Sequence, residues 1–229
     1  RVSVFSCNTD WRAPGDTARH TLSFLFDSLL DVPMYFLCAV LKEVGLYKQW
    51  NTLLRDVFCT SGAVFGRAGW KRFTLWWMMQ SPLPMMVDNR DACVQVTVYD
   101  CLDEKTPYIL VLITDKADAP VPRGCNADTV RMSVGTVVLR LQHAGCKSVR
   151  VSGFVAVDMH LRFTPLFMQR QAAAGAVCEV VAAWEEQAKA AHAAQKAGNR
   201  VRNAHVSAAE NDEGFYRMLQ ERLTRLESP

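Results

Sequence analysis

The side chains that could carry covalent or acid–base chemistry are scattered along this chain. Its eight cysteines and five histidines form no Cys-x-x-Cys pair and no set at zinc spacing, and no Gly-x-Ser-x-Gly turn presents a nucleophile. Asp100, Asp103, Glu104 and Asp115 follow apolar runs, at strand ends where carboxylates usually face water. The sequence therefore predicts no metal site, no cofactor and no hydrolytic centre.

An enzyme that works inside an apolar fold would still need a polar pair in its interior. Thr97, Tyr99 and His160 are the candidates for such a pair. Thr97 and Tyr99 alternate with the valines of the same strand, so they should point to the opposite face of a sheet. We therefore expect a protein that is not an enzyme.

Composition restricts the remaining classes. Half of the 229 residues are apolar, 21% are charged, and the net charge is +3, which is typical of one folded domain. Lys and Arg are not clustered, which disfavours nucleic acid as a partner. The longest apolar run, residues 32–41, is too short to cross a bilayer, and residues 1–7 alternate like a strand and not like a signal peptide. Unpaired thiols favour a cytoplasmic protein, and the lack of a long apolar run favours one that is soluble or peripheral at membranes.

Hydrophobic periodicity predicts strands first and helices last. Strands are expected at residues 2–6, 20–26, 71–79, 91–100, 107–114, 129–142 and 147–160, as an antiparallel meander. Asp31 should cap a helix that Gly45 closes, and residues 50–69 should be irregular. A long helix is expected at 166–197, with one face formed by Phe167, Gln171, Ala174, Cys178, Val181 and Ala182.

The apolar strand faces admit two interpretations. By pattern alone they predict ordinary core packing more readily than a cavity, because most apolar stripes are only core. Trp76, Trp77, Met78 and Met79 are bulky enough to fill any space between sheet and helix. A last amphipathic helix, with Phe215, Leu219 and Leu223 on one face, should dock on the domain or on a partner and not on a membrane.

Four segments occur in a fixed order between residues 2 and 197. They are a proline-started helix ending in Tyr47-Lys48-Gln49-Trp50, the corner Pro82-Leu83-Pro84 with Asn89-Arg90-Asp91, Val130-Arg131 before a long strand, and Asp158 ahead of Pro165. Together they resemble the START domain, the lipid-transfer fold named after the steroidogenic acute regulatory protein. The resemblance implies an α+β helix-grip fold, in which a curved antiparallel sheet wraps around a long C-terminal helix and leaves an internal apolar cavity.

The resemblance also implies a function. Residues 1–197 would be a START-like lipid-binding domain and residues 198–229 a C-terminal helical extension. The domain would bind one lipid, a phospholipid, a sterol or a related molecule, and transfer or sense it at membrane surfaces. The lipid-binding residues would be Phe73, Leu75, Trp77, Val94, Val96, Val98, Leu110, Leu112, Val155, Val157, Phe167 and Cys178. The gating loop would include Asp118, Pro120, Val121 and Pro122, and Val121 and Phe167 would touch the membrane.

The chain departs from the family pattern at two places. Residues 85–88 add two positions to the proline corner, and Val96 stands where the family's sterol and phosphatidylcholine carriers have a buried arginine. Valine cannot pair a headgroup. Arg90 and Arg131 match the pattern and should anchor turns and strand ends. The alternative to a lipid carrier is a protein-interaction module that keeps a START-like fold but has a filled tunnel.

Overall fold

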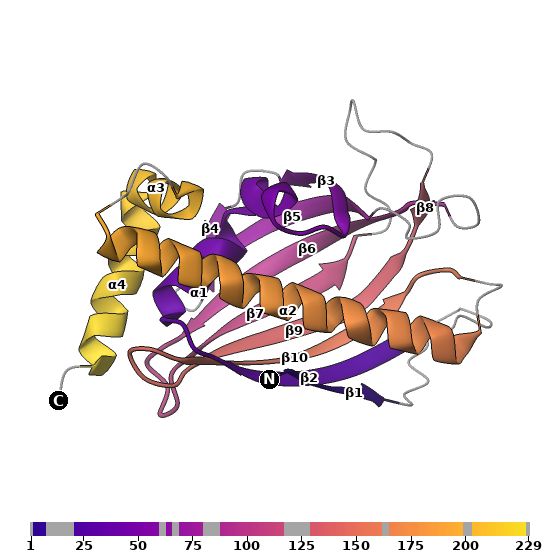
Figure 1. The fold of residues 1–229 in the computed structure, drawn as a ribbon, viewed down its shortest axis with the longest axis horizontal. Coiled ribbons are helices and arrows are strands. Elements are labelled where there is room, and N and C mark those ends of the chain that lie inside the picture. Colours follow the sequence, from indigo (N-terminus) through magenta and orange to yellow (C-terminus); the bar gives the residue numbers. More distant parts are fainter. Residues whose placement is uncertain are drawn as a thin grey trace.

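A curved sheet with a long helix across its concave face forms the body of the protein (Figure 1). The computed structural model describes residues 2–7, 21–59, 63–65, 69–79, 88–116, 129–161, 165–198 and 203–227. The α+β helix-grip architecture expected from the sequence is confirmed. No helix in these ranges combines the length and the apolar character that a membrane crossing needs.

Within the described residues, the sheet has ten strands in the order β1-β2-β10-β9-β7-β6-β5-β3, with β4 beside β5 and β8 beside β6. Their bounds are Val2–Cys7 (β1), Leu22–Leu30 (β2), Leu54–Cys59 (β3), Ala63–Phe65 (β4), Gly69–Met79 (β5), Arg90–Cys101 (β6), Tyr108–Asp115 (β7), Val130–Arg131 (β8), Ser133–His143 (β9) and Val149–Asp158 (β10). All neighbours are antiparallel except β6 and β8. The predicted antiparallel meander is formed by β5, β6, β7, β9 and β10.

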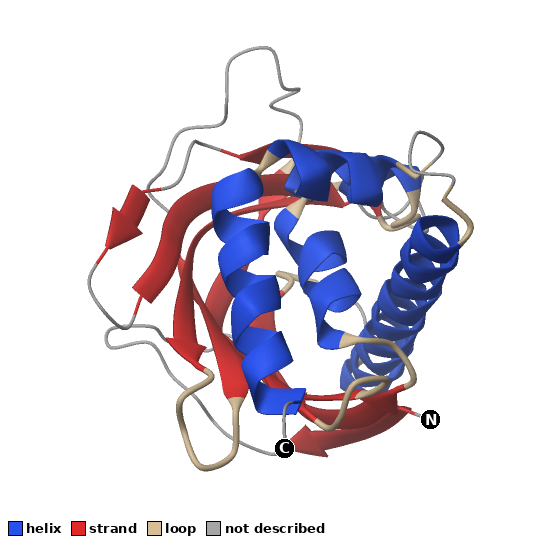
Figure 2. Ribbon diagram, turned by 90° about the vertical axis from the view of Figure 1, so that its left-hand side faces the viewer, coloured by secondary structure: helices blue, strands red, loops and turns tan. Residues whose placement is uncertain are grey.

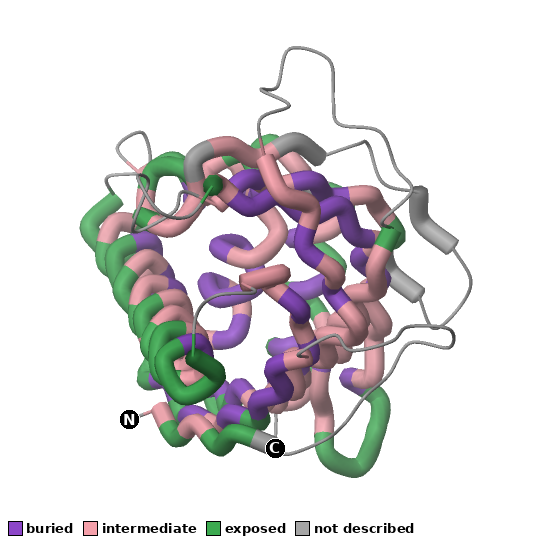
Figure 3. Tube along the Cα trace, turned by 90° about the vertical axis from the view of Figure 1, so that its right-hand side faces the viewer, coloured by how far each residue is buried: buried purple, intermediate pink, exposed green. Residues whose placement is uncertain are grey.

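The helices are α1 (Met34–Lys42), the 3-10 helix η1 (Val44–Gln49), α2 (Leu166–Lys196), α3 (Ala204–Asn211) and α4 (Glu213–Glu227). Asn203 caps α3, because its side chain accepts hydrogen bonds from the backbone N–H groups of His205 and Val206. The buried side of α2 faces the sheet, and its outer side is exposed (Figure 3). α4 packs on the domain, with Leu219 and Leu223 in the main core cluster, so the predicted docking occurs within the chain itself.

Several local predictions were wrong. Pro33, with no side-chain cap, precedes α1 in place of an Asp31 cap, and Gly45 lies inside η1. The segment predicted to be irregular contains β3 and β4, because its glycines hid short strands, and the strand predicted at 129–142 is divided between β8 and β9. The buried residues of α2 are Gln169, Val181, Trp184, Ala188 and Ala191, so the face through Phe167 and Ala182 was misplaced.

Gly153 allows an aromatic ring to lie directly against the backbone of β10. A Cβ atom at this position would lie 2.5 Å from Phe26 Cε1 and 2.9 Å from Leu139 Cδ2. Gly153→Ala is therefore expected to lower the free energy of unfolding by about 1–3 kcal/mol through overpacking, measured by urea denaturation. The control is Gly175→Ala in α2, where a Cβ would meet nothing within 4 Å; it should stabilise by about 0.5–1 kcal/mol. Equal effects of the two changes would refute this account.

Candidate functional site

An apolar cavity of about 310 Å³ lies between the sheet and the helices. Its floor comes from β5, β6, β7 and β9, and its cover from α1, η1, the turn after η1, β3, the middle of α2 and the first turn of α4. A volume of this order lies at the lower end of the range for ligand pockets. The inner sheet surface and the long helix are therefore separated by an internal space.

Alternation along β5 decides which bulky side chains enter this space. Trp77 and Met79 line the cavity, whereas Trp76 and Met78 are buried in a separate cluster with Cys93 on the other face of the strand. Because successive side chains of a strand point to opposite faces, only two of these four bulky residues enter the cavity. The expectation that this run could fill the space is not met.

The cavity brings together five of the predicted lipid-binding residues: Phe73, Leu75, Trp77, Val96 and Val98. Leu110 and Leu112 lie outside its lining, because β7 turns the alternate residues Ile109, Val111 and Ile113 towards it. The other predicted residues are also outside the lining. Val94 is fully buried in the core, Val155 and Val157 pack at the core margin, Cys178 is partly buried, and Phe167 is 68% exposed. The four gating-loop residues, 118 and 120–122, fall outside the described residues.

Sequence reasoning missed the cover of the cavity. Its residues come from α1, η1, the following turn, β3, α2 and α4: Cys38, Leu41, Lys42, Val44, Tyr47, Trp50, Asn51, Leu53, Leu54, Val57, Val180, Trp184 and Phe215. The sequence predicted a helix after Asp31 that Gly45 closes. The sequence pattern of this helix did not indicate that it lies over a cavity and not over a solid core.

Polar atoms gather at the α1–η1 side of the cavity. The Tyr47 hydroxyl donates to the Leu41 carbonyl at 2.5 Å, and Asn51 Oδ1 accepts from the Leu53 N–H at 3.1 Å. The indole N–H of Trp50 is buried and has no hydrogen-bond partner within the described part of the chain. Apart from these three residues and Lys42, the lining of the cavity is apolar.

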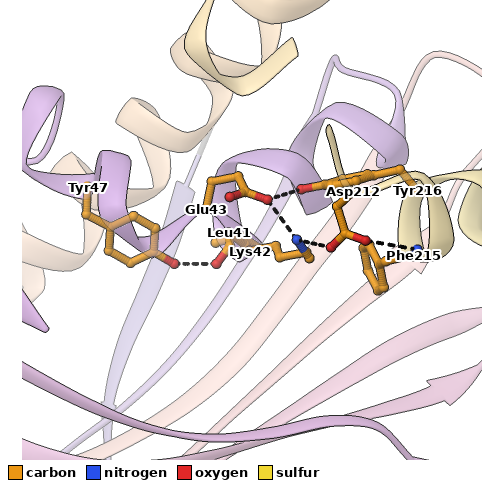
Figure 4. Close-up of polar contacts among 7 residues, drawn as sticks. All are labelled: Leu41, Lys42, Glu43, Tyr47, Asp212, Phe215 and Tyr216. Carbon is orange, nitrogen blue, oxygen red and sulfur yellow. Dashed lines mark hydrogen bonds and ion pairs between the residues drawn. The ribbon is translucent and has the colours of Figure 1, made fainter. Parts of the chain in front are cut away.

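Lys42 is the charged residue among the described residues of the lining, and two carboxylates already hold its ammonium group. Lys42 Nζ lies 2.8 Å from Glu43 Oε1 and 2.8 Å from Asp212 Oδ2 (Figure 4). Burial by itself lowers the pKa of Lys42, but the hydrogen bonds to Asp212 and Glu43 outweigh it, and the pKa is raised. The lysine stays charged and is compensated within the protein.

The Asn-Arg-Asp segment has an architectural role. Arg90 Nε donates to the Met159 carbonyl at 2.8 Å and Arg90 Nη1 to the Asp88 carbonyl at 2.6 Å. Asp91 Oδ2 accepts from the Trp76 indole at 2.8 Å and from Arg131 Nε at 2.9 Å. The predicted anchoring by Arg90 and Arg131 is confirmed, and neither arginine lines the cavity.

The three polar candidates named from the sequence do not come together in the cavity. Thr97, Tyr99 and His160 are all absent from its lining, and the backbone N–H of His160 donates to Asp158 Oδ1 at 2.8 Å. In the described ranges, no three His, Cys, Asp or Glu side chains are close enough together to hold a metal ion. What the site offers chemically is an apolar enclosure.

Comparison with solved structures places this architecture in a known fold. The chain superposes on human STARD10 (18% identity, 85% of this chain and 72% of that chain covered, TM-score 0.62) and on human StAR-related lipid transfer protein 5 (13%, 83% and 83%, 0.65). A STAR-related lipid transfer protein from Xanthomonas axonopodis is also similar (15%, 82% and 93%, 0.58). The sequence matches no protein-family model and no curated protein.

These likenesses define a START-like fold for this chain. The resemblance predicted from four short segments is thereby confirmed at the level of the fold, although identity to each of these structures is below 20%.

Proposed function

We propose that this protein binds one lipid non-covalently in the cavity and carries or senses it at membranes, without catalysing a reaction. The observation that supports the proposal is an apolar space of about 310 Å³ between the sheet and the helices. Each methylene group removed from water contributes about 0.8 kcal/mol, so an apolar enclosure is what a lipid tail needs to cross an aqueous phase.

The buried part of the ligand should carry no net charge. Lys42 is already neutralised by Glu43 and Asp212, and Val96 lines the cavity where an arginine would be needed to pair a headgroup. An unpaired charge transferred into this wall would pay a large desolvation cost. Sterols, neutral glycerides and the tails of phospholipids fit this condition.

Blocking the cavity should abolish binding while leaving the fold intact. Val111 pairs with Val98 and Leu139, which also line the cavity, so Val111→Phe directs a ring into it. We expect lipid transfer between vesicles to fall about tenfold or more, since losing contact with two methylene groups corresponds to about 1.6 kcal/mol. Fluorescent-lipid transfer measures this.

The matched control is Val138→Phe. Val138 lies on β9, pairs with Leu112 and is absent from the cavity lining. It receives the same added ring on the outer face of the sheet and should transfer lipid like the unmodified protein. If Val111→Phe transfers lipid at the rate of the unmodified protein, the cavity is not the lipid-binding site.

Membrane contact is proposed for the first turn of α2. Leu166, Phe167 and Met168 are exposed in succession, at 38%, 68% and 48%. In Figure 1 this end of α2 lies opposite the end that carries α3 and α4. Exposed apolar side chains grouped in this way mark interaction surfaces. A cytoplasmic protein that binds membranes peripherally and transiently would use this turn to enter the bilayer surface.

Phe167→Ser is expected to slow transfer while leaving lipid binding unchanged. Burying a Phe side chain contributes about 1.5–3 kcal/mol, so the transfer rate should fall by about tenfold or more. Co-sedimentation with vesicles checks the membrane contact, and lipid content checks the cavity. Gln171→Ser, an exposed change on the same helix, should alter neither. An unchanged transfer rate for Phe167→Ser would exclude this turn from membrane contact.

A further inference from the structure

The C-terminal extension contributes to the cavity. Phe215, in the first turn of α4, lies in the cavity lining together with residues of α1, α2 and the sheet. Seen along the molecule, α1 and α4 stand across one end of the concave face of the sheet (Figure 2). The extension therefore supplies part of the enclosure and is not a separate appendage.

A partly buried polar cluster of Lys42, Glu43, Asp212 and Tyr216 fixes the position of Phe215. Asp212 Oδ1 accepts a hydrogen bond from the Phe215 backbone N–H at 3.3 Å, and Asp212 Oδ2 is held by Lys42. The Tyr216 hydroxyl donates to Glu43 at 2.8 Å (Figure 4). Lys42 Nζ also lies 5.4 Å from the Phe215 ring centroid and 4.7 Å from that of Tyr216, within cation–π range. The first turn of α4 is thus fastened to the end of α1.

The rest of α4 is held independently of this cluster. Leu219 is fully buried and Leu223 is nearly so, both within the main core. Arg222 bonds to Asp100 and lies 2.7 Å from Asp103, beside the end of β6. Two separate attachments, one to α1 and one to the sheet, allow little displacement of Phe215 when a ligand presses against it.

We propose that Phe215 is the end stop of the ligand cavity and limits the length of the apolar chain that the protein accepts. The inference rests on the proposed lipid-binding function. A tail that extends towards α4 meets an aromatic ring fastened to Lys42, Asp212 and Tyr216, and further methylene groups must remain outside or fold back. Residues 212–216 of the extension thereby act on ligand choice.

A chain-length series tests this proposal. Monoacylglycerols are uncharged and differ only in tail length, and their binding can be followed by intrinsic fluorescence because Trp50, Trp77 and Trp184 line the cavity. In the unmodified protein, affinity should rise about fourfold per added methylene and then stop at a limiting length. Phe215→Ala should move that limit to longer chains, and Phe215→Trp should move it to shorter ones.

Met218→Ala, on the exposed side of the same helix, is the control and should keep the original limit. An unchanged limit in both Phe215 variants would overturn the end-stop proposal and leave lipid binding intact. If Phe215→Ala fails to fold, the Phe215→Trp variant decides in the same way. If no monoacylglycerol of any length binds the unmodified protein, the end-stop inference fails, whereas the proposed function fails only if no lipid is taken up from vesicles of any composition.

Discussion

Replacing Asp91 by alanine is expected to lower the free energy of unfolding by about 3–5 kcal/mol. Asp91 is 1% exposed and joins three elements, since its carboxylate accepts from Trp76 of β5 and from Arg131 of β8 while its own residue belongs to β6. Removal leaves a partly buried guanidinium and a buried indole N–H without their acceptor. Chemical denaturation followed by circular dichroism measures the loss.

Asp27→Ala is the control for this change. Asp27 forms a two-bond pair with Arg150 at 2.9 and 2.8 Å, but both side chains are exposed. Exposed pairs of this kind contribute about 0–1 kcal/mol. If the two alanine variants lose similar stability, the hydrogen bonds of Asp91 to Trp76 and Arg131 do not hold β5, β6 and β8 together in the way described.

The Asp91 carboxylate should also determine how the free energy of unfolding falls at acidic pH. Burial raises the pKa of Asp91, but the hydrogen bonds from Arg131 and Trp76 together outweigh burial and the pKa is lowered. Its contribution is therefore complete above the pKa of the unfolded chain and is lost as the pH falls through the lower pKa of the folded protein. Asp91→Asn should flatten this part of the pH dependence.

Leu219→Ala is expected to lower the free energy of unfolding of the whole protein by about 2–5 kcal/mol. The Leu219 side chain is completely buried, with 0% of its surface accessible to solvent. It belongs to the same core cluster as residues of β2, β9 and β10. A cavity made in α4 is therefore made in the common core. Urea denaturation should show one transition, displaced to lower urea.

Met218→Ala, one residue earlier on the exposed side of α4, should change stability by no more than about 0.5 kcal/mol. These two results would mean that residues 198–229 unfold together with residues 1–197, so the boundary predicted at residue 198 would not divide the chain into independently folding units. A Leu219→Ala variant that keeps the main transition and loses only the helical signal of α4 would show that the extension folds by itself.

The sheet was predictable where one face of a strand is apolar and the other is not. In β6, Val96 and Val98 alternate with Gln95, Thr97 and Tyr99, and the inner face was identified correctly. In β7 the two faces are equally apolar: one carries Ile109, Val111 and Ile113, and the other carries Leu110 and Leu112. The alternation of residues therefore does not indicate which face of the strand points towards the cavity. Only the pairing of β7 between β6 and β9 decides which set faces inward.

The cover of the cavity could not be predicted for a different reason. Phe215 is separated by more than 100 residues from every sheet residue in the lining except those of β9, and no local pattern links it to Lys42. Phe167 was assigned to the interior by helical spacing, yet residues 165–168 are all exposed. Spacing identifies a helix face, whereas the length of helix that the sheet covers depends on tertiary structure.

The most direct test of the account is the organic-soluble content of the purified protein after exposure to mixed-lipid vesicles. Mass spectrometry of the extract should find an uncharged lipid or a phospholipid at about one molecule per chain, and Val111→Phe should reduce it to background. An extract equal to a mock purification for the unmodified protein, with no uptake from vesicles of any composition, would contradict the central claim that the cavity between sheet and α2 is a lipid site.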